Sequence, residues 1–314
     1  MASATDQQTA QNVPQKGGVF ALGNFDGVHR GHQAVLKLAI EKARGLGVPA
    51  RAMTFEPHPR SVLKPDIPPF RLTPAAAKDR LLRKLGLDDV VVLPFTPGFS
   101  DLSAQDFVQR VLLGTYGAQH VVAGFDYVFG HRRSGTMAQL REWLAPQGVS
   151  VTEVTPFRDS HGEVMSSSRT RDALKAGDVA LAEHILGRPW SIAGMVVKGD
   201  QRGRQLGFPT MNIPLGEYMR PRFGVYTITA SPVGSARQYA GIANLGLRPT
   251  VDGKTELLEA HLFDFHQEVY GQEWEVYLCH FQRDEQSFGS LEALKQQITL
   301  DVDAARTYHA SRIM

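Results

Sequence analysis

The chain changes its hydrophobic pattern near Asp178–Trp190, and this change limits the folds that it can adopt. Before it, short apolar runs alternate with segments whose apolar residues recur at helical spacing. After it, short β-type runs follow one another, separated by loops rich in Gly and Pro, until a last helical stretch. Alternating strands and helices are typical of a parallel sheet, whereas consecutive short strands are typical of a small barrel or sandwich. The sequence therefore predicts two different folds in one chain.

The apolar runs predict where the strands and two of the helices lie. The expected strands cover residues 19–22, 50–55, 90–93, 121–123 and 151–154, then 191–197, 225–229, 239–243, 257–263 and 274–278. Ser103 and Ser290 are candidate N-caps, because a serine hydroxyl can accept a hydrogen bond from a backbone N–H of the first helical turn. The expected apolar stripe of the last helix is Leu291, Leu294, Ile298 and Val302.

We expect three segments along the chain. Residues 17–182 would form a Rossmann-like α/β domain with a parallel sheet, and residues 183–314 a small antiparallel β-barrel with a terminal helix. Residues 1–16 are polar and rich in Gln and Ala, without the apolar core of a signal peptide, and we expect a disordered leader there.

Composition excludes several classes of function. The 34 Lys and Arg residues nearly balance the 32 Asp and Glu residues, so bulk charge supports binding to neither nucleic acid nor a membrane surface. No stretch approaches the roughly 18 apolar residues that span a bilayer. The single cysteine, Cys279, excludes an internal disulfide framework and a cysteine-rich metal site. These features predict a soluble, cytoplasmic protein of two domains.

The first candidate site is the segment Gly23–His32, between an expected strand and an expected helix. Its glycines allow a tight turn, and the free N–H groups of the following helix favour an anion there. His29 and His32 could donate hydrogen bonds to a triphosphate as its charge builds up, with Gly31 keeping the space beside them clear. A plain turn and a zinc-binding histidine pair are the alternatives, although no third zinc ligand is suitably spaced.

This segment resembles the HxGH signature of the nucleotidylyltransferase superfamily. Three further segments, Thr54–Pro59, Gly124–Gly130 and Ser166–Arg171, resemble the FMN adenylyltransferase half of bacterial bifunctional FAD synthetases. The resemblance implies that His29 and His32 are catalytic. The ATP-binding residues that it implies are Gly23, Asn24, Phe25, Asp26, Gly31, Ser167, Ser168 and Arg171, and the flavin-binding residues are His58 and Asp126.

Two alternatives remain open in these segments. The serine run could be a simple helix cap, and His58 could bond only to neighbouring backbone. The sequence also departs from the family pattern, because Ser168 stands where a Thr is usual and Thr170 where an Ile is usual.

The second candidate site combines a glycine-rich loop with a glutamate on a strand. The loop carries Gly199, Gly203, Arg204 and Gly207 and leads to Thr210 and Asn212, whose oxygens suit Mg²⁺ that bridges phosphates. Glu259 lies between apolar residues on an expected strand, where it could be the general base for a hydroxyl nucleophile. The alternatives are an ordinary turn for the loop and an exposed edge-strand position for the glutamate.

These residues resemble riboflavin kinase, whose loop ends in Pro-Thr-Ala-Asn and whose catalytic Glu lies in a Glu-x-His strand. Here Met211 replaces the Ala. The resemblance implies an ATP-binding loop, Mg²⁺ at Thr210 and Asn212, and flavin-binding roles for Asn244 and Arg283.

Together the two resemblances imply one bifunctional enzyme, since they cover nearly all of the chain in the family's order. It would convert riboflavin to FMN and then FMN to FAD, with ATP as co-substrate and no nucleic-acid or membrane partner. The alternatives are a flavin-binding regulator that has lost turnover and an adenylyltransferase whose barrel binds RNA. Assembly into a homo-oligomer is left open.

Overall fold

The computed structural model describes residues 16–199, 203, 207–250 and 253–312. Contacts divide the chain into two compact units. Unit 1 comprises Met1–Phe25, His32–Pro65 and Asp79–Pro156, and unit 2 comprises Asp26–Gly31, Asp66–Lys78 and Phe157–Met314. The domain boundary expected between residues 182 and 183 stays a prediction, and residues 1–15 of the expected leader lie outside the described residues.

Unit 1 contains the parallel sheet that the sequence predicts, and its strands run in the order β3-β2-β1-β4-β5. The strands are β1 (Val19–Leu22), β2 (Ala50–Glu56), β3 (Asp89–Pro94), β4 (His120–Gly124) and β5 (Ser150–Val154). The strand order reverses between β1 and β4, and ligands of open α/β sheets bind outside the carboxyl ends of the strands at such a point. The chain leaves β1 at Gly23 and β4 at Phe125, so two of the predicted site segments begin there.

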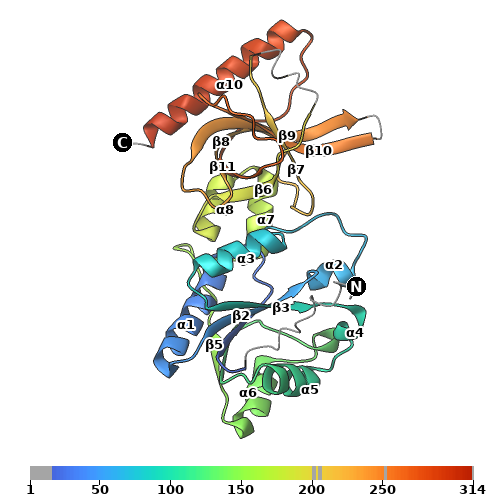
Figure 1. The fold of residues 1–314 in the computed structure, drawn as a ribbon, viewed down its shortest axis with the longest axis vertical. Coiled ribbons are helices and arrows are strands. Elements are labelled where there is room, and N and C mark those ends of the chain that lie inside the picture. Colours follow the sequence, from blue (N-terminus) through green and yellow to red (C-terminus); the bar gives the residue numbers. More distant parts are fainter. Residues whose placement is uncertain (1–15, 200–202, 204–206, 251–252, 313–314) are drawn as a thin grey trace, which may run out of the picture. The chain divides into compact units, whose positions relative to one another are not determined.

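Helices cover the sheet, and Figure 1 shows α1 and α6 on opposite sides of it. The helices of this part of the chain are α1 (Arg30–Leu46), α2 (Pro59–Leu63), α3 (Ala75–Lys84), α4 (Pro97–Ser100), α5 (Ala104–Asp106) and α6 (Met137–Leu144), with a π-helical segment at Phe107–Thr115 and 3₁₀ turns at His131–Arg133 and Ala145–Gln147. Ser103 caps α5 as predicted, because its hydroxyl accepts a hydrogen bond from the Asp106 N–H at 3.0 Å.

One face of the sheet packs against the π-helical segment and α6. Phe20 and Leu22 of β1 pack in one core cluster with Leu112 of the π-helical segment and Leu140 of α6. All four residues of β1 are buried, which is typical of a parallel strand covered on both faces.

Unit 2 contains an antiparallel sheet of six strands in the order β6-β11-β8-β9-β10-β7. The strands are β6 (Trp190–Met195), β7 (Met211–Pro214), β8 (Gly224–Pro232), β9 (Tyr239–Thr250), β10 (Gly253–Leu262) and β11 (Glu273–Arg283). A single bridge between Val197 and Asn212 joins the two ends of this order, so the sheet is a nearly closed barrel. The two largest buried side chains of its core are Trp190 and Trp274.

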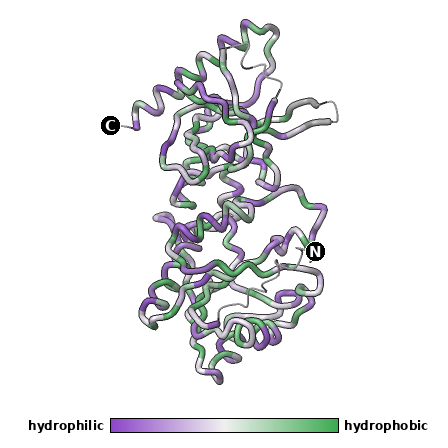
Figure 2. The backbone as a smooth tube through the Cα atoms, in the orientation of Figure 1, coloured by the Kyte–Doolittle hydropathy of each residue, from purple (hydrophilic) through white to green (hydrophobic). Residues whose placement is uncertain are grey.

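Unit 2 also contains α7 (Ser167–Ala176), α8 (Val179–Leu186) and the terminal α10 (Leu291–Ser311). Ser290 caps α10 as predicted, at 3.1 Å from the Ala293 N–H. Hydrophobic and hydrophilic residues alternate along this helix (Figure 2). Ile298 and Val302 pack against the barrel, but the prediction was wrong for Leu291, which is 71% exposed because it lies in the first turn, ahead of that contact.

The sequence pattern did not predict β7. This strand has only four residues and follows directly on Gly207–Thr210, so its pattern resembles the end of a loop. It became a strand because its residues pair antiparallel with β10, from Met211 opposite Ala260 to Pro214 opposite Leu257. Long-range pairing of this kind has no local signal.

Candidate active sites

A buried ion pair organises the part of the first site that belongs to unit 2. The carboxylate of Asp26, whose side chain is 3% exposed, accepts hydrogen bonds from Nη2 of Arg171 at 2.5 Å and from the backbone N–H groups of Leu72 and Thr73 at 3.0 and 2.9 Å. The Ser167 hydroxyl donates to the Asp26 carbonyl at 2.8 Å. The structure thus brings together three of the predicted residues, and Asp26 orients Arg171 through its carboxylate.

His29 is buried in the same unit, with 7% of its surface exposed. Burial lowers its pKa to about 4, and the nearby carboxylate of Asp26 offsets this only in part. The imidazole is therefore neutral at pH 7, with one N–H to donate. A Cβ on Gly31 would lie 3.1 Å from the His29 ring and 3.2 Å from the Met165 carbonyl oxygen, so a larger residue would press on both.

The residues of the same motif that belong to unit 1 surround an aromatic contact. The buried Phe25 ring meets the His32 ring edge to face, with 5.4 Å between the ring centroids. A Cβ on Gly23 would lie 3.0 Å from the Phe25 ring. Asn24 is exposed, and its carbonyl accepts a hydrogen bond from the Thr54 hydroxyl at 3.1 Å. These contacts hold the turn that leads from β1 into α1.

The segments that follow the other strands differ in exposure. His58 is 8% exposed and caps α2, since its Nδ1 accepts a hydrogen bond from the Arg60 N–H at 3.1 Å. This is the hydrogen bond to neighbouring backbone that the sequence left open as an alternative for His58. Asp126 is exposed just after β4, and Ser168 is exposed in the first turn of α7. Ser166 is the N-cap of α7, through a bond of 3.2 Å from the Arg169 N–H.

In the barrel, three predicted residues from different parts of the chain form one row. Glu259 of β10 is directly opposite Asn212 of β7 on one side and Asn244 of β9 on the other. Directly paired residues on adjacent strands point to the same face, with their Cβ atoms about 5 Å apart. Leu258 and Ala260 point to the opposite face, into the core, where both are fully buried. The row therefore places a carboxylate between two amides outside the core.

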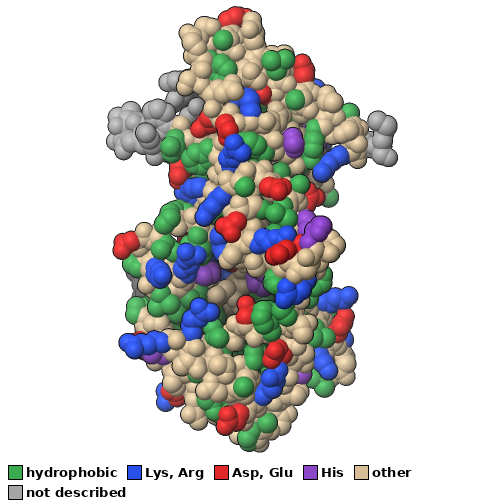
Figure 3. Space-filling view, turned by 180° about the vertical axis from the view of Figure 1, so that it is seen from behind, with side chains coloured by type: hydrophobic (Ala, Val, Ile, Leu, Met, Phe, Trp, Pro, Cys, Tyr) green, Lys and Arg blue, Asp and Glu red, His purple; other side chains and the backbone are tan. Residues whose placement is uncertain are grey.

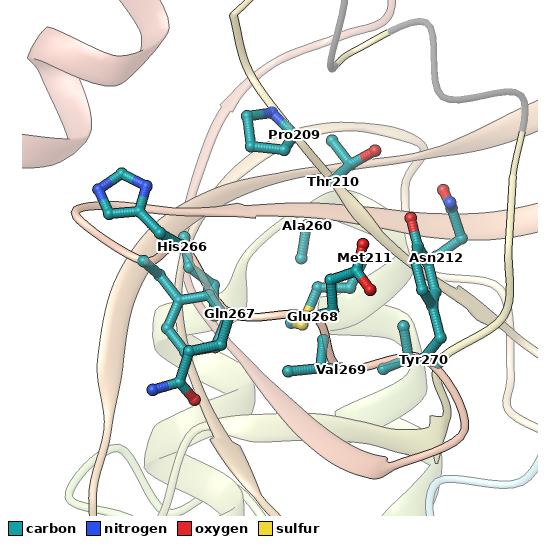
Figure 4. Close-up of a pocket in the computed structure, with 13 residues that line it drawn as sticks. Pro209, Thr210, Met211, Asn212, Ala260, His266, Gln267, Glu268, Val269 and Tyr270 are labelled. Atoms are coloured by element: carbon teal, nitrogen blue, oxygen red, sulfur yellow. The ribbon is translucent and has the colours of Figure 1, made fainter.

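A pocket of about 270 Å³ adjoins one end of this row. Residues of two segments line it, and Figure 4 shows both. They are Pro209–Asn212 at the start of β7 and Phe265–Tyr270 after β10, together with Val196, Ala260 and Leu262. Asn212 belongs both to the row and to the pocket wall, so it connects the two.

Asn212 Oδ1 is a buried oxygen without a hydrogen-bond partner among the described residues, in a side chain that is 5% exposed. A Cβ on Gly199 would lie 2.4 Å from its Nδ2, so the backbone of the glycine-rich loop lies directly against this amide. A buried carbonyl oxygen left unpaired is costly unless a ligand or cation meets it. Together with the Thr210 hydroxyl on the same pocket wall, it fits a hard cation such as Mg²⁺.

The other glycines of the loop are described only in part. A Cβ on Gly203 would lie 2.5 Å from the Phe208 carbonyl oxygen, and Gly207 has a φ of +89° that favours glycine. Arg204 lies outside the described residues.

Two residues that the sequence analysis did not select contact this site. His261 Nδ1 donates to the Pro209 carbonyl at 2.9 Å and so restrains the segment that carries Thr210. Its signal in the sequence was its place two residues after Glu259, on the same face of the strand. Glu285 accepts a hydrogen bond from Asn244 Nδ2 at 3.1 Å, and a Cβ on Gly246 would overlap its carboxylate. No local pattern indicates this second contact.

Arg283 is held by the terminal helix. Its Nε and Nη2 donate to the two carboxylate oxygens of Asp301 at 2.9 and 2.6 Å, and Gln297 donates to the same carboxylate at 2.9 Å. Asp301 is 4% exposed. α10 therefore determines where the guanidinium lies.

The surface carries mixed charge. On the face shown in Figure 3, Lys and Arg side chains are interspersed with Asp and Glu side chains. Within the described ranges, no helix has the length and apolarity that crossing a membrane requires.

Comparison with known proteins finds a family match for each half of the chain. The FAD synthetase family profile matches residues 11–169, and the riboflavin kinase profile matches residues 186–309. The chain is 39% identical over 296 residues to the bifunctional riboflavin kinase/FMN adenylyltransferase of Escherichia coli K12, with 94% of each chain covered. It is 42% identical over 297 residues to the protein of that name from Pseudomonas fluorescens, again with 94% of each chain covered.

A solved structure has the same fold over nearly the whole length. It is a protein from Streptococcus pneumoniae described as a macrolide-efflux protein, with a TM-score of 0.80 and 34% identity, and the match covers 93% of this chain and 94% of that one. Both profiles and the full-length relatives agree with the motifs found at the two sites. The chain therefore belongs to the family of bifunctional riboflavin kinase/FMN adenylyltransferases.

Proposed function

We propose that the protein carries out two successive transfers from ATP. The barrel phosphorylates riboflavin to FMN and releases ADP. The N-terminal half then adenylylates FMN to FAD and releases pyrophosphate. The observation that carries this proposal is the row of Asn212, Glu259 and Asn244, which adjoins a pocket at the end of the glycine-rich loop.

In the kinase step, Glu259 takes the proton from the 5′-hydroxyl of the ribityl chain, and the hydroxyl oxygen attacks the γ-phosphate of ATP. The nucleotide enters from the side of the pocket and the flavin from the side of Asn244 and Arg283. Asn212 pairs with Glu259 across the two strands and also lines the pocket, so it is the residue that the two features share.

Thr210 and Asn212 would hold Mg²⁺ in this reaction. The buried Asn212 oxygen and the Thr210 hydroxyl supply oxygen ligands, and phosphate oxygens would complete the coordination. When bound, the ion neutralises charge on the transferring phosphate. His261 holds the Pro209 carbonyl and so keeps these ligands in place.

In the adenylyltransferase step, the phosphate of FMN attacks the α-phosphate of a second ATP molecule. His29 and His32 donate hydrogen bonds to the triphosphate, and His29 does so as a neutral imidazole. Arg171 adds positive charge in an orientation set by Asp26. The further residues that would contact ATP are Gly23, Asn24, Phe25, Gly31, Ser167 and Ser168. Those that would contact the flavin are His58 and Asp126.

One assay tests both steps. The purified protein is incubated with riboflavin, ATP and Mg²⁺, and the flavins are separated by chromatography; we expect FMN and then FAD. Glu259→Gln should lower FMN formation about 10²–10⁴-fold, the range for removal of a general base, while added FMN is still converted to FAD. His29→Ala combined with His32→Ala should do the reverse and accumulate FMN.

Glu273→Gln is the matched control, because this glutamate is exposed on another strand of the same barrel. It should leave both steps unchanged. If Glu259→Gln retains full kinase activity, the assignment of the base is wrong. If the unaltered protein forms neither FMN nor FAD, it is a flavin-binding regulator instead. The cytoplasmic location stays a prediction from the sequence, and assembly into a homo-oligomer stays open.

A further inference from the structure

The turn that carries His29 has a strained backbone. Gly27 has a φ of +85° and Val28 a φ of +44°, and Val28 is 2% exposed. A β-branched residue rarely adopts a positive φ, and such a conformation costs about 1–3 kcal/mol. It persists only when surrounding groups hold it in place. The groups that hold this turn therefore decide where the His29 imidazole lies.

Arg188 holds the turn from behind. Its Nη2 donates to the Gly27 carbonyl at 2.8 Å and its Nη1 to the Val28 carbonyl at 3.3 Å. A further bond of 3.4 Å ties the same guanidinium to the Leu186 carbonyl at the end of α8. One rigid fork thus connects Gly27 and the strained Val28 to the segment between α8 and β6.

Arg188 carries a buried charge that a purely structural contact with backbone carbonyls does not require. The guanidinium is largely buried, and burial lowers its pKa to about 10, so it stays charged at pH 7. The carboxylate of Glu275 lies near enough to raise this pKa in part, while the hydrogen bonds of the guanidinium go to backbone carbonyls. A buried cation is costly, and Glu275 offsets this cost only in part, since the pKa stays lowered. A polyanion bound at the adjacent turn would be attracted by this charge, and the attraction would offset the cost of burying it.

Neighbouring contacts attach the same turn to the barrel side of the chain. The Gly27 N–H donates to the Thr73 hydroxyl at 2.8 Å, and the Trp190 indole N–H donates to the Leu72 carbonyl at 2.9 Å. A Cβ on Gly27 would lie 2.7 Å from the Leu72 side chain. Arg188 and Trp190 lie in the segment matched by the riboflavin kinase profile, whereas Gly27 lies in the segment matched by the FAD synthetase profile.

We propose that Arg188 is a positioning residue for adenylyl transfer: its guanidinium fixes the carbonyls of Gly27 and Val28 and so aligns His29 with the triphosphate. The kinase-type half of the sequence then contributes to the reaction of the other half. This inference rests on the proposed adenylyltransferase function. It predicts an effect on kcat, because a small displacement of an aligned donor costs about 10²-fold in rate.

The test measures steady-state conversion of FMN to FAD and of riboflavin to FMN by full-length variants. Arg188→Met should lower kcat for FAD formation about 100-fold, and Arg188→Lys about 10-fold, because lysine keeps the charge without the fork. The KM for ATP should change less than kcat. The kinase activity of the same chains should stay within about twofold, and amide hydrogen exchange should accelerate in residues 26–31.

Arg220→Met is the matched control, since Arg220 also donates to backbone carbonyls of unit 2, those of Gly216 and Tyr218. It should leave FAD formation unchanged. The inference is overturned if Arg188→Met and Arg188→Lys retain full kcat for FAD formation, or if both activities fall in parallel. If the unaltered protein makes FMN but no FAD, the proposed adenylyltransferase function itself fails, and this result differs from the other two.

Discussion

At the scale of single residues, the buried ionisable groups of unit 2 define what the first site can do. Asp26 is fully engaged by Arg171 and by backbone donors, so it acts by orienting its neighbour. His29 is kept neutral by burial. The sequence identified all three residues, but it could not distinguish a group that contacts the ligand from one that positions another group. That distinction depends on contacts between residues 26, 72 and 171, which are distant in the chain.

The lowered pKa of His29 predicts a pH-dependent stability. The folded-state pKa of about 4 lies below the unfolded value of 6.5, so the unfolded state binds a proton more tightly between these values. Stability is therefore lost as the pH falls from about 6.5 toward 4, and the loss at pH 5 is about 2 kcal/mol.

Urea unfolding at pH 7 and pH 5 measures this effect, with His29→Gln as the variant that cannot titrate. The unaltered protein should lose about 2 kcal/mol more than His29→Gln between the two pH values. His120, whose pKa is also lowered by burial, is present in both proteins and cancels in the comparison. An equal loss in both proteins would show that His29 is not buried in its neutral form.

At the scale of elements, local signals in the sequence were sufficient where one segment determines its own structure. The caps Ser103 and Ser290 and the strand Val19–Leu22 are of this kind, because hydroxyl caps and short apolar runs act within a few residues. The structure of β7 and the exposure of Leu291 are instead determined by distant parts of the chain. Their state depends on what a distant element offers as a partner, so periodicity alone does not reveal it.

The proposed flavin-binding role of Arg283 predicts that the terminal helix acts on the kinase reaction through Asp301. Asp301→Asn removes the charge that holds Arg283, and breaking a buried pair of this type costs about 3 kcal/mol. Because the freed guanidinium can leave the flavin side of the site, the KM for riboflavin should rise about 10-fold. Conversion of added FMN to FAD should be unaffected.

Paired kinetic assays of the two steps measure this prediction. Asp303→Asn is the control, because Asp303 is exposed on the same helix two residues later. It should change neither the KM nor the stability. An unchanged KM for riboflavin in Asp301→Asn would mean that α10 stabilises the barrel without positioning Arg283 for the flavin.

At the scale of the whole molecule, the proposed catalytic groups form two separate sets. The row of Asn212, Glu259 and Asn244 belongs entirely to the barrel. The proposed adenylyltransferase residues share none of its members. The product of one reaction is the substrate of the other, so each set can be removed without removing the other.

Mixing two inactivated chains tests this independence. Glu259→Gln cannot make FMN, and the chain with His29→Ala and His32→Ala cannot use it. An equimolar mixture with riboflavin, ATP and Mg²⁺ should restore FAD, with FMN appearing first in solution. Either chain alone is the control. A mixture that accumulates FMN but forms no FAD would show that FMN has to be made and used within one chain.

The sequence by itself determined the two fold classes, the motifs and the chemistry that they suit, because strand and helix periodicity and short motifs are local properties of the chain. The tertiary structure decided which residues meet. It placed Asn212, Glu259 and Asn244 in one row. It paired Asp26 with Arg171 and Asp301 with Arg283, and it brought Arg188 to the strained turn at Val28. These contacts join residues that are far apart in the chain, and packing and strand register, which only the folded protein has, bring them within hydrogen-bond distance.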